Sequence, residues 1–353
     1  MSLERSQNHN ELPQLPSSFN VKEVVVAGDR GPCGGVIRAI EATQKVLDHV
    51  QRIKEQTGIQ IPVYASHQIV HNEPISKELA SRGLIIEPNP DIIDSGSIYL
   101  LSAHGTRPSV VQTLREKGVI VCNLECQLVT ADRTRAERTI ANGKDLAYFG
   151  TPGHPEPLAV TGDLPQDRIH IIDSNKMPRE IEMPTAPFDA LSQTTISKER
   201  ARRRLGIWGK MHGVEVPVFD KGTCPATDNR QNALRDIFSR REPLVDLALV
   251  ITSGTSHNGE ELRKIAQKAR KGSITLDSID QLDTSIFTED VQRVALTSSA
   301  SVLDRYTLPF LQLLQKGGAH IRINFGKEKY GSFSPPKDLD LVHNYLGQKY
   351  GIQ

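Results

Sequence analysis

The chain repeats one pattern along most of its length: an apolar run typical of a strand, then a polar loop, then a stretch with helical spacing of apolar residues. Examples are IPVYA before PISKELASRG, SIYLL before PSVVQTLREKG and LALVIT before EELRKIAQKARKG. Strands separated by helices lie parallel, because the crossover helix returns the chain to the start of the next strand. The pattern predicts an α/β fold with mainly parallel sheets. The loops that follow the strands should then emerge at one edge of each sheet, where ligands bind in open α/β folds.

Three cysteines recur at nearly equal intervals, Cys33, Cys126 and Cys224, each in a loop between an apolar stretch and a helical one. If the three sheet edges face a common centre, the cysteine loops surround one cavity. The alternative is three similar domains in a row without a shared centre. Cys122, which ends the apolar run VIVC, is expected in the core rather than among the ligands.

The interval between the cysteines matches the size of a small domain, and 353 residues are enough for three of them. The polar, proline-containing start of the chain is read as a mobile tail. We therefore expect an N-terminal tail, three α/β domains that each contain one of the three evenly spaced cysteines, and a C-terminal tail, at residues 1–20, 21–125, 126–222, 223–325 and 326–353.

Three thiols on three domains suit a soft metal centre, either an iron-sulfur cluster or a zinc ion completed by a histidine. The competing interpretation is that the cysteines fill small apolar spaces, as free cysteines often do. Loop-forming residues beside two of the thiols, Pro32, Gly34 and Pro225, weigh against it.

Charge and hydropathy exclude several classes of function. Lys and Arg number 43 against 42 Asp and Glu, a formal net charge of +1, so nothing favours nucleic acid or an anionic membrane as partner. The sequence contains no apolar run of about 18 residues and no basic-then-apolar start. We expect a cytoplasmic protein that acts on a small molecule, with neither a transmembrane helix nor a secretory signal.

Histidine, hydroxyl and amide side chains gather in the loops, including His71, His104, His154, Ser256, His257, Asn258 and Ser301. Such groups at helix N-termini can bind a phosphate without lysine. The motifs GxxxxGK[ST] and GxGxxG do not occur, which argues against a nucleotide triphosphatase and a Rossmann enzyme. For each serine, threonine or asparagine, simple helix capping is the alternative.

Glu156, in the motif GHPE, is a candidate proton donor. A carboxyl group confined in a mostly neutral cavity has its ionised form disfavoured and can stay protonated near neutral pH. Thr194 is a candidate to relay that proton.

The ordered motifs GPCGGV, VHN, SAHG, ECQLVT, GHPE, SQTT, TCPATDNRQ, SHN and SAS resemble those of the 4-hydroxy-3-methylbut-2-enyl diphosphate reductases, from about residue 22 to about residue 325. The resemblance implies a pseudo-threefold trefoil of three α/β domains around a central cavity with one 4Fe-4S cluster. It also implies an open iron for the substrate's hydroxyl, isopentenyl and dimethylallyl diphosphates as products, and a low-potential electron donor such as ferredoxin or flavodoxin.

The same resemblance implies roles for individual residues. Each of the three cysteines would bind one iron, and Glu156 would supply a proton with Thr194 in the relay. The diphosphate or its proton network would be contacted by His71, His104, His154, Ser256, Asn258 and Ser301, while Asn229 belongs to the NRQ motif after the third cysteine.

The sequence departs from the family mainly around Cys126. The usual Asp-x-Thr-Cys-Pro string is Asn123-Leu124-Glu125-Cys126-Gln127 here, and the usual Lys-Val-His is Ala131-Asp132-Arg133. His257 replaces one of the paired serines in the diphosphate loop. These changes keep two alternatives open: a diverged paralogue that reduces another allylic or phosphorylated substrate, and a cluster-binding sensor without turnover.

Overall fold

The computed structural model describes residues 12–177, 180, 184, 186–217, 223–239, 244–269, 272–326 and 335–351. Two compact units make up the chain. The first unit joins Met1–Pro32 to Arg230–Lys327, and the second joins Cys33–Asn229 to Glu328–Gln353. Each unit therefore contains two segments that are far apart in the sequence.

A five-stranded parallel sheet forms the centre of the first unit, in the order β10-β9-β11-β1-β12. Its strands are β1 (Glu23–Val26), β9 (Leu247–Ile251), β10 (Gly272–Leu276), β11 (Arg293–Ser298) and β12 (His320–Ile323). The helices are α8 (His257–Lys268), α9 (Asp304–Lys316) and the larger part of α7 (Pro225–Ile237), with short 3-10 helices at Ile279–Gln281 and Thr284–Ile286.

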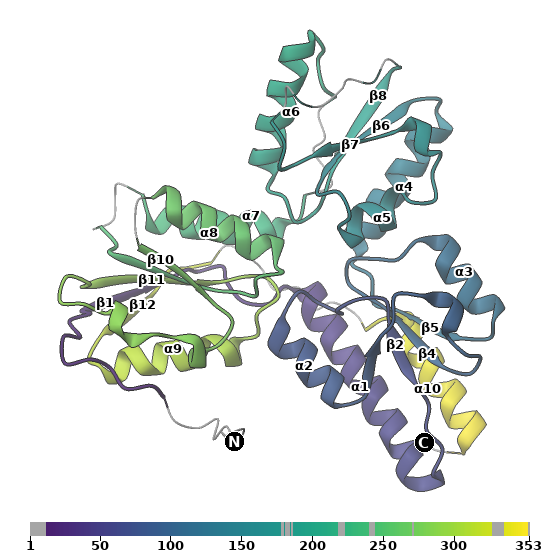
Figure 1. Cartoon of the computed structure of the whole chain (residues 1–353), viewed down its shortest axis with the longest axis horizontal. Coiled ribbons are helices and arrows are strands. Elements are labelled where there is room, and N and C mark those ends of the chain that lie inside the picture. The colour runs from purple at the N-terminus through teal and green to yellow at the C-terminus, as the bar shows by residue number, and fades with distance from the viewer. Residues whose placement is uncertain are drawn as a thin grey trace, which may run out of the picture. The chain divides into compact units, whose positions relative to one another are not determined.

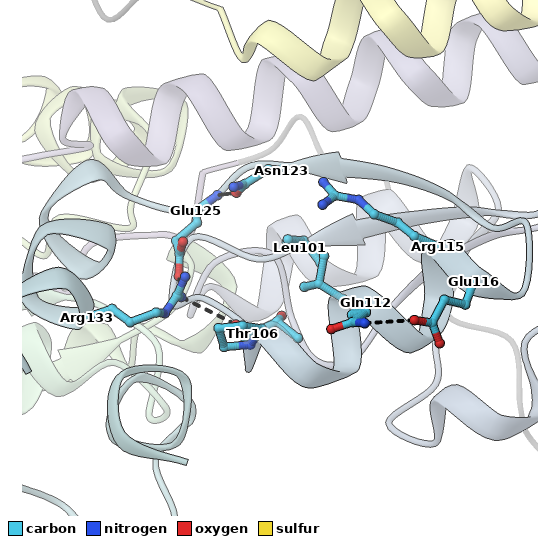
Figure 2. Close-up of a pocket in the computed structure, with 10 residues that line it drawn as sticks. Leu101, Thr106, Gln112, Arg115, Glu116, Asn123, Glu125 and Arg133 are labelled. Atoms are coloured by element: carbon cyan, nitrogen blue, oxygen red, sulfur yellow. Dashed lines mark hydrogen bonds and ion pairs between the residues drawn. The ribbon is translucent and has the colours of Figure 1, made fainter. Parts of the chain in front are cut away.

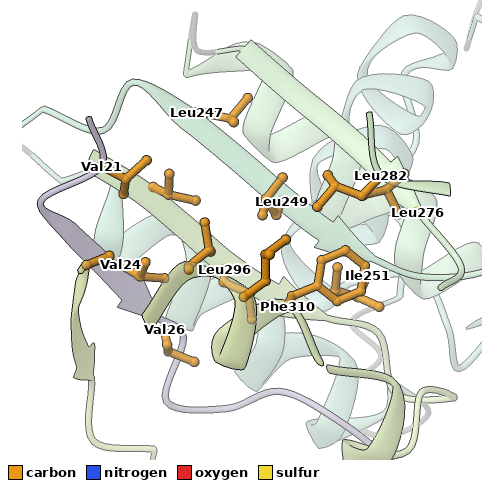
Figure 3. Close-up of a cluster of buried hydrophobic side chains, with 14 of the residues drawn as sticks. Val21, Val24, Val26, Leu247, Leu249, Ile251, Leu276, Leu282, Leu296 and Phe310 are labelled. Carbon is orange, nitrogen blue, oxygen red and sulfur yellow. The ribbon is translucent and has the colours of Figure 1, made fainter. Parts of the chain in front are cut away.

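Alternation along β1 divides the core of this unit into two layers. Val24 and Val26 pack in a cluster with Leu249, Leu296 and Phe310 of α9 (Figure 3). Val25 points to the other face, against buried side chains of α7 and α8. Helices consequently cover both faces of the sheet, α9 on one and α7 with α8 on the other (Figure 1). This is why the strands read as nearly continuous apolar runs.

The position of β1 differs from the sequence-based division, which placed residues 21–125 together. β1 lies between β11 and β12 in the sheet of the third cysteine's segment. A strand joins the sheet that covers its two faces and both of its edges. The apolar pattern of the strand's own sequence does not specify which sheet that is. The three-domain boundaries remain a prediction.

The expectation of a mobile tail over residues 1–20 is wrong for its described part, residues 12–20. Leu12, Leu15 and Phe19 pack against the apolar cluster of the first unit. The Phe19 ring lies 5.6 Å from that of Phe287, edge to face. The average polarity of the segment concealed these three apolar residues.

Two smaller parallel sheets form the second unit. One has the order β3-β2-β4-β5 and the strands β2 (Val63–Ala65), β3 (Leu84–Ile86), β4 (Ile98–Leu101) and β5 (Ile120–Asn123). The other has the order β7-β6-β8 and the strands β6 (Asp145–Gly150), β7 (Ile169–Asp173) and β8 (Phe188–Ser192).

Helices pack around these two sheets: α1 (Gly34–Thr57), α2 (Glu73–Ser81), α3 (Pro108–Glu116), α4 (Gln127–Ala141), α5 (Pro155–Thr161), α6 (Lys198–His212) and α10 (Lys337–Tyr350), with 3-10 helices at Pro90–Ile92 and Gln166–Arg168. Helix α10 lies in the segment read as a C-terminal tail. Its residues Leu339, Val342 and Leu346 are buried, and the helix packs on α1 and β5.

Local helix signals are confirmed where the chain is described. Asn72 caps α2 by accepting a hydrogen bond from Ile75 N at 2.9 Å, and Pro108 stands in the first turn of α3. Pro309 lies inside α9, which begins at Asp304. The apolar run VPVFD before Cys224 falls largely on residues 218–220, outside the described residues.

The predicted α/β class with parallel sheets is confirmed, since every strand pairing among the described residues is parallel. Among the same residues no helix combines the length and apolarity needed to cross a membrane.

Candidate active site

Each of the three cysteines stands at the start of a helix in the second unit. Cys33 and Cys126 are the N-cap residues of α1 and α4. The carbonyl of Cys224 accepts from Asp228 N at 3.2 Å, as α7 begins. All three are half-buried and free of disulfides. The positive ends of three helix dipoles therefore lie next to the sulfur atoms, which favours thiolates and other negative charge.

The three sulfur atoms share one region. A methyl group placed on Gly35 would lie 3.6 Å from Cys126 Sγ and 3.9 Å from Cys33 Sγ. Burial raises the pKa of the Cys126 thiol to about 12, and repulsion from the Cys224 and Cys33 thiols adds to the rise. Such a thiol releases its proton when a cation arrives, which is how metal binding displaces protons.

Three cysteine thiols are donors that fit an iron-sulfur cluster. Within the described residues, no three His, Cys, Asp or Glu side chains stand close enough to hold one ion. Cysteine thiolates are the usual ligands of iron-sulfur clusters. Gly35 has no side chain beside Cys126 Sγ and Cys33 Sγ, where a Cβ would contact both sulfur atoms.

Glu156 lies in the same region and is almost completely buried, with 1% exposure. Its two carboxylate oxygens accept hydrogen bonds from Thr194, one from the backbone N at 2.6 Å and one from Oγ1 at 2.9 Å. Burial raises the pKa of Glu156 to about 8, against the effect of these hydrogen bonds, and nearby Asp132 raises it further. The carboxyl group is therefore protonated at neutral pH, as the sequence predicted for a proton donor.

Two buried groups behind Glu156 were not predicted as site residues. Tyr148 donates its phenol hydrogen to Glu156 Oε1 at 3.5 Å, and burial raises its pKa well above the ordinary value. Asp132 is completely buried and pairs with Arg135 at 2.6 Å. Burial raises the pKa of Asp132 to about 7, although Arg135 opposes the rise. The sequence offered one indication for Tyr148, which is the phenol in the otherwise apolar run DLAYFG. A buried phenol normally needs a hydrogen-bond partner.

The three candidate histidines form one cluster in the second unit. The ring centroids of His71 and His104 are 4.0 Å apart, and those of His104 and His154 are 5.6 Å apart. His154 Nδ1 accepts from Glu156 N at 3.1 Å, so neutral His154 carries its proton on Nε2. That nitrogen lies 3.3 Å from His71 Nε2. The cluster therefore connects directly to the helix that carries Glu156.

The remaining candidates lie in the first unit, apart from Asn229, which is half-buried on α7 in the second. Ser256 caps α8 and accepts from Gly259 N at 3.2 Å. Asn258 accepts from Ala300 N at 3.0 Å, and Ser301 lies 3.2 Å from Ser299 through their hydroxyls. His257 is the first residue of α8. For Ser256, capping is thus one established role.

Cys122 lies on β5 and is completely buried. Burial raises the pKa of its thiol to about 12. The expectation that Cys122 is a core residue is confirmed.

Comparisons with known proteins identify the family of the chain. A sequence model of the family described as LytB protein matches residues 24–314. The 4-hydroxy-3-methylbut-2-enyl diphosphate reductase of Tropheryma whipplei is 33% identical over 302 residues, which cover 84% of this chain and 91% of that protein. The protein of the same name from Acinetobacter baumannii (strain AYE) is 29% identical over 325 residues, covering 90% and 98%.

Solved structures show the same fold. The E-1-hydroxy-2-methyl-but-2-enyl-4-diphosphate reductase of Plasmodium falciparum matches 93% of this chain and 99% of that chain, with a TM-score of 0.80 at 24% identity. A second structure, described as (E)-4-hydroxy-3-methyl-but-2-enyl diphosphate reductase, the terminal enzyme of the non-mevalonate pathway, matches 84% of this chain with a TM-score of 0.57 at 22% identity.

Proposed function

The chain belongs to the LytB family, and we propose that it reduces 4-hydroxy-3-methylbut-2-enyl diphosphate to isopentenyl and dimethylallyl diphosphates. The reaction takes up two electrons and two protons and releases the hydroxyl group as water. The observation that carries this proposal is the buried carboxyl of Glu156, which is held by two hydrogen bonds from Thr194 and lies near the Cys126 thiol. A proton donor next to a site for a soft metal cofactor is what a reductive dehydroxylation requires.

Cys33, Cys126 and Cys224 would hold one 4Fe-4S cluster, with one iron left without a protein ligand. When bound, that group would supply the electrons and a Lewis-acidic iron for the departing hydroxyl group. The three helix N-termini that carry the cysteines would stabilise its negative charge.

Glu156 would deliver the proton that leaves with the hydroxyl group. Its carboxyl is held by two bonds from Thr194 and one from Tyr148, so it points in a fixed direction before substrate arrives. The Thr194 hydroxyl could pass a proton to Glu156 from the substrate's diphosphate. The protonated state below pH 8 follows from burial.

His71, His104 and His154 would bind the diphosphate. The tilted contact between the His71 and His104 rings and the hydrogen bond between His71 and His154 orient the ring nitrogens. Ser256, His257, Asn258, Ser301 and Asn229 remain substrate-binding residues within the same proposal.

The proposal includes a low-potential donor such as ferredoxin or flavodoxin and a cytoplasmic location. The altered residues near Cys126 favour one second candidate function, reduction of another allylic or phosphorylated alcohol. Asp132 and Glu125, both carboxylates that the family pattern lacks at these positions, are buried there. Buried charge near the cysteines changes the electrostatics that a substrate meets.

Turnover by the reconstituted protein tests the function. The protein is purified without oxygen, supplied with iron and sulfide, and mixed with the diphosphate substrate and a strong reductant. Formation of both isoprenoid diphosphates is expected. An iron-loaded protein that leaves this substrate unchanged would refute the proposal, and reduction of another allylic alcohol by the same preparation would support the second candidate.

Glu156→Gln tests the proton donor. The amide keeps the shape of the side chain but cannot donate an acidic proton, so kcat should fall about 10²- to 10⁴-fold while iron content stays unchanged. Glu137→Gln, at an exposed position of α4, is the matched control and should retain full activity. Equal activity in the two variants would contradict the assigned role.

Serine at each of the three cysteines tests the ligand set. Iron content after reconstitution should fall in all three variants, because an alcohol is a poor ligand for iron in such clusters. Cys122→Ala is the control, since this thiol lies in the core of the sheet, and it should retain its iron. Full iron loading in any of the three serine variants would remove that cysteine from the set.

A further inference from the structure

A buried ion pair lies next to the loop of the second cysteine. The Glu125 carboxylate, one residue before Cys126, pairs with the guanidinium of Arg133, and only 2% of the Glu125 side chain is exposed. Its other oxygen accepts from Thr130 Oγ1 at 2.9 Å. Figure 2 shows Glu125 and Arg133 facing each other. Both residues are departures from the family pattern, and the structure makes them partners in a single interaction.

The Arg133 guanidinium also binds two backbone carbonyls in other segments. Its Nε donates to Ala159 O at 2.9 Å, in the helix that carries Glu156. A terminal nitrogen donates to Thr106 O at 3.4 Å, two residues after His104. One side chain therefore ties together the loop of the second cysteine, the helix of the proton donor and the loop of a phosphate-binding histidine.

Hydrogen bonds of the backbone at Glu125 and Cys126 fix the position of the cysteine relative to the ion pair. Glu125 N donates to Asn123 Oδ1 at 2.8 Å, and its carbonyl accepts from Arg38 at 3.2 Å. Cys126 N donates to Ala103 O at 3.0 Å. With these groups held, the loop has little freedom to absorb a change at the ion pair. A displacement of the Glu125 side chain would move the sulfur of the next residue.

The ion pair of Glu125 and Arg133 lies in the wall of a pocket. A pocket of about 520 Å³ is lined by Arg133 and Glu125 together with Thr106, Leu101 and Arg115 (Figure 2). A shorter residue at position 133 would enlarge the pocket beside Glu125 and remove the guanidinium that pairs with its carboxylate. That carboxylate would then stand without its cation, one residue from a cluster ligand.

We propose that Arg133 is a positioning residue that couples the Cys126 loop to the segments carrying Glu156 and His104, and that it neutralises Glu125 beside the cluster. The inference rests on the proposed function, because it assigns a purpose to the ion pair only if Cys126 binds the cluster. Arg133 and Glu125 lie outside the reacting groups, but together they set the position of the Cys126 loop and the net charge beside the cluster.

Arg133→Gln in the reconstituted full-length protein tests the coupling. We expect kcat to fall about 10- to 100-fold, as is usual when a residue behind the ligands is lost, and KM to rise because the His104 loop is released. The midpoint potential of the cluster should become more negative, since an unpaired negative charge disfavours reduction. Adding Glu125→Gln to the first change should return the potential towards that of the wild type.

Arg168→Gln is the matched control. Arg168 also binds one carboxylate, that of Asp145, and two backbone carbonyls, those of Ile140 and Lys144, but it contacts none of the proposed site residues. The Arg168→Gln variant should lower thermal stability to an extent similar to that of Arg133→Gln, and it should leave the cluster potential and KM unchanged. If Arg133→Gln changes stability alone and otherwise matches this control, the coupling is refuted.

Arg133→Lys keeps the test decisive if the glutamine variant does not fold. A single ammonium group can neutralise Glu125 but cannot also reach both carbonyls, so the potential should stay near the wild-type value while kcat falls. Wild-type kcat in this variant would overturn the proposal. A wild-type protein that binds no iron would refute the proposed function instead, so the two failures are distinguishable.

Discussion

Thr194→Val should raise the pKa of Glu156, and with it the upper limit of the pH range in which the protein is active. The hydroxyl of Thr194 donates to Glu156 Oε2 at 2.9 Å and stabilises the ionised carboxylate. A hydrogen bond to a charged group contributes about 1.5 to 3 kcal/mol, and one pKa unit corresponds to about 1.4 kcal/mol. Removing the hydroxyl should therefore raise the pKa by about 1 to 2 units.

The pH dependence of kcat/KM measures this change, because it reports the ionisation of the free protein. Glu156 acts in its protonated form, so wild-type activity should be constant below pH 8 and fall above it. In Thr194→Val the fall should begin at about pH 9 to 10, whatever the height of the plateau. Thr195→Val removes the adjacent hydroxyl, which bonds to Gln193 instead, and should leave the limit unchanged. An unchanged or lower limit in Thr194→Val would refute the reasoning.

Two further variants test the buried groups around this site. Asp132→Asn should flatten the pH dependence of stability. The pKa of Asp132 in the folded protein, about 7, lies above its ordinary value of 3.8. The stabilisation that protonated Asp132 contributes is therefore complete below about pH 4 and is lost as pH rises towards 7. Between pH 5 and 8 the free energy of unfolding of the wild type should fall by roughly 3 kcal/mol more than that of the variant. Melting temperatures of the two proteins that change with pH by the same amount would contradict this. Gly105→Ala should lower stability by about 1 to 3 kcal/mol more than Gly143→Ala, because both glycines have positive φ but only the first would press a methyl group against Ala159 and Val129. Equal melting temperatures for the two alanine variants would contradict this, because they would show that the neighbours of Gly105 accommodate the methyl group without loss of stability.

The fold class and many local elements could be predicted because they depend on short-range patterns. The apolar runs of β4, β6 and β9 and the cap at Asn72 are properties of a few neighbouring residues. The same reasoning missed α10 and the packing of residues 12–20. In both segments the apolar residues recur at helical or irregular spacing within polar sequence, and their burial depends on surfaces supplied by distant parts of the chain.

Long-range pairing could not be predicted for the same reason. The strand β1 resembles the others in sequence, yet it inserts between β11 and β12, and its Glu23 pairs with Arg293 of the first and His320 of the second. Parallel strands carry no turn between them to set the partner, so the choice depends on which sheet can bury both faces of the strand.

The sequence by itself determined the parallel α/β class, the three cysteines at helix starts and the identity of Glu156 as the candidate acid, because residue type, spacing and neighbouring loop formers are local facts. Only the tertiary structure decided that Thr194 and Tyr148 hold that acid, that three histidine rings cluster beside it, and that Glu125 and Arg133 form one buried pair. Burial and short distances between groups far apart in the chain set pKa values and positions, and both exist only once the chain has folded.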